Sequence, residues 1–107
     1  MNWSVEMLNE TVQAEIDTLP ADMQAKFLQI AGMIREFGLA NVGQPHVKHV
    51  RGKLWEMRLK GRDGISRALY VTAFGRRVIV VRAFVKKTQE IPEAEINLAL
   101  RRAQEVL

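Results

Sequence analysis

The hydrophobic pattern of this 107-residue chain changes from the period of a helix to that of a strand at a loop over residues 41–45. Before the loop, apolar side chains recur at steps of three and four, the spacing of a helix that packs on one face: Met23, Phe27, Ile30, Ile34 and Phe37. After the loop, apolar and charged residues alternate, as on strands with one buried face. Over residues 54–60, this alternation predicts a core face and a charged face: Trp55, Met57 and Leu59 on the first, Glu56, Arg58 and Lys60 on the second. Helices followed by a sheet indicate an α+β fold.

Capping residues predict where the helices begin and end. Residues 3–8 alternate as a short first strand, and Asn9 can cap a helix that runs to Leu19. Pro20 is expected to be the first residue of a second helix, which ends at Gly38 because helix C-termini favour the positive φ of glycine. Pro92 opens a last helix, whose apolar side is expected to face the body of the protein: Ile96, Ala99, Leu100, Ala103 and Leu107.

Turn residues separate four predicted strands in the second half of the chain. These strands cover residues 47–50, 54–60, 65–73 and 77–85. Their short connections predict antiparallel neighbours. The apolar run VIVV at residues 78–81 is expected inside the sheet, covered on both faces. At this length, residues 1–107 are predicted to form a single domain.

Positive charge is concentrated in the predicted sheet. Twelve of the sixteen Lys and Arg residues lie between His46 and Thr88, together with only two of the twelve acids. Such a concentrated positive field attracts and holds polyanions, nucleic acid above all. The basic residues expected to bind nucleic acid lie on or beside the strands: Lys48, Arg51, Lys53, Lys60, Arg82 and Lys86.

The composition argues against several other functions. The chain has no cysteine, which excludes disulfides, thiolate catalysis and cysteine metal sites. His46 and His49, three residues apart on a strand, are expected on opposite faces, so no metal or other cofactor is predicted. No apolar run is long enough to cross a membrane, and the first residues do not resemble a signal peptide. A cytoplasmic protein without a membrane partner is therefore expected.

Arginines supply the chemistry that this pattern offers. Arg58 and Arg67 lie on adjacent predicted strands, and two guanidinium groups in one groove can hold a phosphate. A cluster of cations can support RNA cleavage without metal, because it orients the 2′-hydroxyl and stabilises the charge on the phosphorane. Glu56 is interpreted as a counter-ion for one of these arginines rather than as a general acid or base. Arg82 interrupts an apolar strand and needs a partner or an open cleft, and Tyr70 could stack on a base.

Five segments occur in the order and at the spacing of a known family. They are Leu19-Pro20, Phe37-Gly38, GKLWEMRLK at 52–60, SRALY at 66–70 and AFVKKTQEIPEAEINLALRR at 83–102. Together they resemble the phage-derived HigB-like branch of the RelE/ParE toxin superfamily over nearly the whole chain. The resemblance implies a RelE-like fold, with an N-terminal strand and two helices, an antiparallel sheet and a C-terminal helix.

The resemblance also implies a function. Toxins of this type belong to type II toxin–antitoxin modules. They cut mRNA on the ribosome, where they also contact ribosomal RNA, and they are silenced by a small antitoxin, usually a helix-turn-helix protein. By position, Arg58 matches a catalytic lysine of RelE-type enzymes, and Arg67 matches their phosphate-stabilising arginine. Lys87, with Lys86, occupies the region that supplies the cation assisting the leaving group. Departures from the family pattern are a carboxylate at Glu56 and the absence of a C-terminal catalytic tyrosine or histidine.

Two other functions stay open. A ParE-like toxin would bind and poison a type II topoisomerase without nuclease activity, and an inactive relative would only bind RNA or its antitoxin. The concentration of cations on the sheet favours the nuclease over the topoisomerase binder, because a protein target does not require so many exposed charges.

Overall fold

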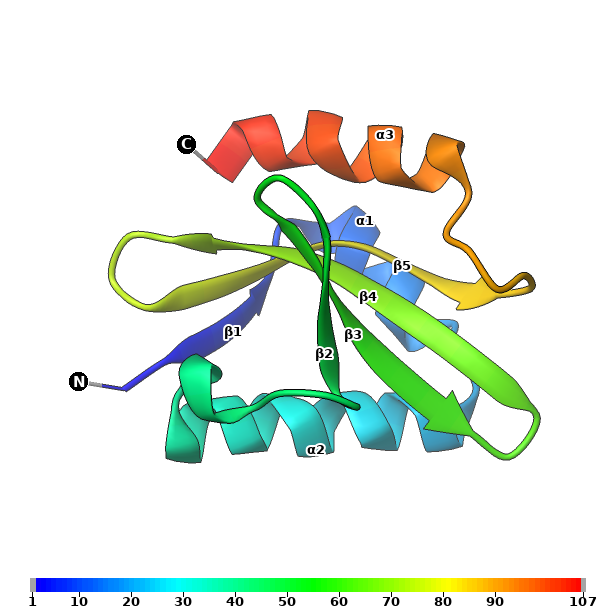
Figure 1. Cartoon of the computed structure of the whole chain (residues 1–107), viewed down its shortest axis with the longest axis horizontal. Helices are drawn as coiled ribbons and strands as arrows, with labels where there is room; N and C mark the ends of the chain where they lie inside the picture. The colour runs from blue at the N-terminus through cyan, green and yellow to red at the C-terminus, as the bar shows by residue number, and fades with distance from the viewer. Residues whose placement is uncertain (1, 107) are drawn as a thin grey trace.

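A computed structural model describes residues 2–106 and contains a five-stranded sheet with helices on both faces (Figure 1). The strand order is β1-β5-β4-β3-β2. The predicted α+β class is confirmed, and β1 extends the antiparallel strands β2 to β5 by pairing parallel to β5. The elements are β1 (Ser4–Met7), α1 (Glu10–Asp17), α2 (Ala21–Phe37), the short 3-10 helix η1 (Leu39–Asn41), β2 (Val47–Arg51), β3 (Leu54–Gly61), β4 (Gly64–Ala73), β5 (Arg77–Lys86), α3 (Glu93–Ala103) and the 3-10 helix η2 (Gln104–Val106).

The first two helices begin and end close to the residues that the capping pattern predicts. The Asn9 side chain accepts a hydrogen bond of 3.0 Å from the backbone N–H of Val12, which satisfies a free donor in the first turn of α1. Pro20 is the N-cap of α2, one residue before the helix itself begins. Gly38 has a φ of 86° where α2 ends, a conformation that a side chain would make unfavourable.

Apolar side chains form one layer on each face of the sheet. The helices α1 and α2 cover the first face, where Val12, Phe27 and Ile30 of the helices pack on the strands. The strand residues of this layer include Met57, Leu59, Tyr70 and Val80. The helix α3 covers part of the second face, above a smaller cluster: Leu69, Val71, Ile79, Val81, Ile96 and Ala99. Figure 1 shows α2 and α3 on opposite sides of the sheet. The predicted interior strand is therefore β5, whose residues 78–81 are all buried.

A β-bulge in β5 determines which of its later side chains face the α3 side. Val81 is an extra residue between Val80 and Arg82, which pair with consecutive residues of β4. Val81 belongs to the apolar cluster under α3, and Arg82 donates hydrogen bonds to that helix. Alternation then continues from Arg82, so Phe84 and Lys86 also lie on the α3 side.

Two side chains predicted in the core are exposed instead. Phe37 is 55% exposed, because it is the last residue of α2 and the chain turns away at Gly38. Trp55 is 39% exposed, because it lies near the start of β3 and lines an open hollow there, where the His49 ring is its neighbour at 5.0 Å between centroids. Leu107 lies outside the described residues. Within residues 2–106, the helices are too short or too polar to span a membrane.

Candidate active site

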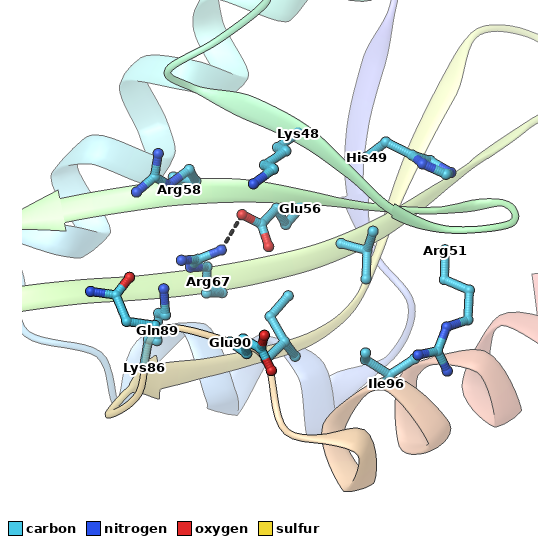
Figure 2. A pocket seen from close by; sticks show the side chains of 12 residues that line it. Lys48, His49, Arg51, Glu56, Arg58, Arg67, Lys86, Gln89, Glu90 and Ile96 are labelled. Carbon is cyan, nitrogen blue, oxygen red and sulfur yellow. Dashed lines mark hydrogen bonds and ion pairs between the residues drawn. The ribbon is translucent and has the colours of Figure 1, made fainter.

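The part of the sheet that α3 leaves uncovered forms an open cavity of about 380 Å³ (Figure 2). Side chains of β3, β4 and β5 line it, together with β2 and the segment that joins β5 to α3. Most of the lining is polar, and the charged groups include Lys48, Glu56, Arg58, Arg67, Lys86 and Glu90. Cations therefore outnumber carboxylates in this cavity, as expected of a site for an anion.

Strand register brings the two arginines that were predicted to be catalytic close together. Arg58 of β3 and Arg67 of β4 are direct partners across the antiparallel pair, a position in which like charges repel. Glu56, two residues before Arg58 on the same strand face, accepts a hydrogen bond from Nη1 of Arg67. The exposed fractions of the Arg67 and Glu56 side chains are 6% and 2%. Of the two arginines considered as partners of Glu56, the structure places Arg67 in contact with it.

Two guanidinium donors of this cavity have no partner in the part of the chain that the structure describes. Among residues 2–106, the Nε atoms of Arg58 and Arg67 are buried and make no hydrogen bond. A buried donor left unsatisfied costs on the order of 1–3 kcal/mol, so an anion that supplied an acceptor would relieve an existing penalty. Phosphate oxygens match the fork of N–H groups along the edge of a guanidinium. The geometry therefore fits a phosphate bound in the cavity, on the face of the paired strands β3 and β4.

Lys86, the last residue of β5, is a third cation of the cavity. Burial lowers its pKa from the ordinary value of 10.5, and the positive charges of Arg67, Arg58 and Lys48 lower the pKa further, whereas Glu56 opposes the shift. A lowered pKa makes the ammonium group a stronger proton donor. A bound phosphate would raise this pKa, because it stabilises the protonated form.

About half of the site residues predicted from the sequence line the cavity. Lys87 is not among them: it follows β5 and is exposed, and Lys86 lines the cavity in its place. Lys60 is exposed and borders a neighbouring hollow of about 290 Å³, and Lys53 is exposed near the end of α3. The predicted residues that do line the cavity are Lys48, Arg51, Arg58, Arg67 and Lys86.

Two residues predicted to contact nucleic acid lie outside the cavity and have other surroundings in the structure. Tyr70 is 1% exposed in the layer under α1 and α2, and burial raises the pKa of its hydroxyl to about 12. Its ring is therefore not available to stack on a base. Arg82 donates hydrogen bonds of 2.7 and 3.0 Å to Glu95 of α3 and lies 3.0 Å from Glu15 of α1. This guanidinium joins two helices to β5 and does not point into the cavity.

Other cavity residues were not predicted from the sequence. Gln89, Glu90 and Ile91 belong to the segment between β5 and α3, which has no periodic pattern that indicates its direction. Their position directly before Pro92, at the start of a helix that packs on the sheet, is the signal that could have found them. Arg51, which was predicted and also lines the cavity, already forms an exposed ion pair of 2.7 Å with Glu93.

Comparisons with known proteins agree with this architecture. Residues 14–104 match the family described as phage-derived protein Gp49-like. The structure is similar to a chain of the archaeal RelE–RelB complex from Pyrococcus horikoshii OT3, with a TM-score of 0.55 and 16% identity, over 81% of this chain and 98% of that one. No curated protein matches the chain in sequence. The chain therefore belongs to the phage-derived Gp49-like family and has the RelE-like fold that its sequence predicts.

Proposed function

We propose that this protein is the toxin of a type II toxin–antitoxin module and cuts mRNA on the ribosome. The observation that supports this most is the pair of opposed arginines with unpaired buried Nε atoms, in a cavity that also contains Lys48 and Lys86. A phosphate of the RNA backbone supplies the acceptors that these donors lack. The ribosome is the place of action in this proposal, which places the protein in the cytoplasm.

The proposed reaction is an attack of the 2′-hydroxyl on the adjacent phosphate. The bond from 2′-oxygen to phosphorus forms, the bond from phosphorus to the 5′-oxygen breaks, and the hydroxyl proton passes to solvent. Arg58 and Arg67 stabilise the negative charge on the phosphorane, and Lys86 donates a proton to the leaving 5′-oxygen. The products are a 2′,3′-cyclic phosphate and a 5′-hydroxyl end.

An antitoxin is the second proposed partner. The archaeal structure that shares this fold is a complex of RelE with RelB. The cationic cavity would attract an acidic segment quickly, and contact between arginines and carboxylates would add specificity. We favour a folded helix-turn-helix antitoxin that blocks entry to the ribosome by its bulk, without occupying the cavity.

A translation system reconstituted from purified components tests this function. The protein should cut mRNA only when ribosomes are present. We also expect a small antitoxin to be encoded beside it, and co-expression of that antitoxin should restore growth of cells that produce the toxin. A parallel assay of DNA supercoiling by a type II topoisomerase distinguishes the rival. Intact mRNA together with inhibited supercoiling would mean that the protein is a ParE-like toxin and not a nuclease.

Binding to single-stranded RNA is expected to weaken steeply with salt. Each neutralised phosphate contributes a slope of roughly −0.7 to the logarithm of the binding constant against the logarithm of salt concentration. Lys48→Ala, in the cavity, should reduce that slope, whereas Arg101→Ala, on the exposed side of α3, should not. Fluorescence anisotropy between about 50 and 200 mM salt measures it. A binding constant that barely changes over this range would rule out an electrostatic interface.

A further inference from the structure

Glu56 is a carboxylate in the wall of a cationic cavity. It is 2% exposed, and it lies on the same face of β3 as Arg58. Its Cα partner on β4 is Leu69, so Arg67 occupies the diagonal position, within reach of a long side chain. Figure 2 shows the Glu56 carboxylate directed at the Arg67 guanidinium, where it accepts the hydrogen bond from Nη1.

This contact determines which edge of Arg67 remains for a ligand. A guanidinium has five N–H donors in a fixed plane, so a bond at Nη1 fixes the direction of the Nε edge. The Nε atom of Arg67 is buried and unpaired, as is that of Arg58 on the opposite strand. Without an anchor, a long side chain beside other cations would gain by turning toward solvent.

We propose that Glu56 is a positioning residue, which holds Nη1 of Arg67 so that the Nε edge stays oriented for the scissile phosphate. The inference rests on the proposed nuclease function and adds a residue that does not touch the RNA. Glu56 is suited to orient rather than to transfer protons, because it is shielded from solvent and occupied by Arg67. Its negative charge also reduces the repulsion between Arg67 and Arg58.

Substitution of Glu56 tests the proposal in the ribosomal cleavage assay. Glu56→Gln keeps the size of the side chain but removes the charge-assisted bond, and Glu56→Asp keeps the charge but shortens the reach. Both variants should lower kcat by on the order of 10-fold to 10²-fold, because a misplaced catalytic group loses that much, while KM stays close to that of the unchanged protein. Asp63→Asn is the matched control: it removes the other carboxylate of the basic segment, at an exposed turn, and should leave kcat unchanged.

A second readout reports the orientation of Arg67 without the ribosome. In the unchanged protein, the Arg67 Nε–H signal in ¹⁵N NMR should shift when inorganic phosphate is added. In Glu56→Gln this response should be lost or weakened, and in Asp63→Asn it should remain.

The two readouts separate the proposals. If the unchanged protein does not cut mRNA, the nuclease function fails, and the phosphate response still decides the role of Glu56. Wild-type kcat in a folded Glu56→Gln or Glu56→Asp protein, or an unchanged phosphate response in Glu56→Gln, would overturn the positioning role. Should Glu56→Gln fail to fold, Glu56→Asp decides the outcome.

Discussion

A folded Arg67→Ala protein is expected to lose growth arrest and at least on the order of 10²-fold in the rate of mRNA cleavage. Arg67 combines three properties at one position: it is buried, its Nη1 is fixed by Glu56, and its Nε has no partner. Donors that are oriented before the reaction stabilise transition-state charge without reorganisation. Growth on inducing medium and single-turnover cleavage on ribosomes measure the effect.

Arg77→Ala is the matched control for this prediction. Arg77 lies at the start of β5, is exposed, and pairs with Glu6 at 2.9 Å, remote from the cavity. Its removal should leave cleavage and growth arrest close to those of the unchanged protein. Circular dichroism establishes that both variants are folded. Full toxicity of a folded Arg67→Ala protein would remove the proposed site.

The second large effect is expected in stability. Glu56→Ala should lower the free energy of unfolding by about 3–5 kcal/mol, because it leaves the Arg67 charge buried without its partner. The double variant Glu56→Leu, Arg67→Met should recover most of that loss, since apolar residues of similar volume often replace a buried ion pair without cost. The double variant should nevertheless be inactive. Urea unfolding followed by circular dichroism gives the three free energies.

The exposed pair between Arg51 and Glu93 provides the comparison. Solvent screens this pair, so Glu93→Ala should change the free energy of unfolding very little. If Glu56→Ala lowers the free energy of unfolding as little as Glu93→Ala does, then loss of Glu56 does not leave Arg67 as an uncompensated buried charge. A double variant that is stable and still active would contradict the role of both residues in the reaction.

Local patterns predicted most of the fold. The helices follow from the period of three and four and from Asn9, Pro20 and Gly38, whose conformational preferences act within a few residues. The antiparallel order of β2 to β5 follows from short turns. The parallel pairing of β1 with β5 joins residues more than seventy positions apart, and no local pattern specifies such a contact.

A β-bulge explains why Lys86 lines the cavity and Lys87, which was predicted to be catalytic, does not. Strict alternation from Ile79 would place residues 81, 83, 85 and 87 on the α3 side of the sheet. The bulge at Val81 shifts the later residues by one position, so that Lys86 lines the cavity and Lys87 does not. A bulge depends on pairing between strands, and the alternation within one strand does not reveal it.

The exposure of the aromatic residues depends on what covers each part of the sheet. Trp55 and Tyr70 are Cα partners on the same face of the sheet, yet Tyr70 is buried and Trp55 is 39% exposed. Met57 and Leu59 of β3 are fully buried on that face, whereas Trp55, near the start of the strand, lines an open hollow. The sequence of each strand is compatible with either depth, so the choice between core and surface needed the assembled sheet.

Cleavage of an mRNA with one 2′-deoxynucleotide is the most direct test of the proposed reaction. Purified protein should cut the unmodified mRNA on the ribosome and leave a 2′,3′-cyclic phosphate and a 5′-hydroxyl end, because the 2′-oxygen is the nucleophile. The same mRNA with a 2′-deoxynucleotide at the cleaved position should remain intact there. Cleavage of the deoxy-substituted site, or ends with a 3′-hydroxyl and a 5′-phosphate, would contradict attack by the 2′-hydroxyl in the cationic cavity.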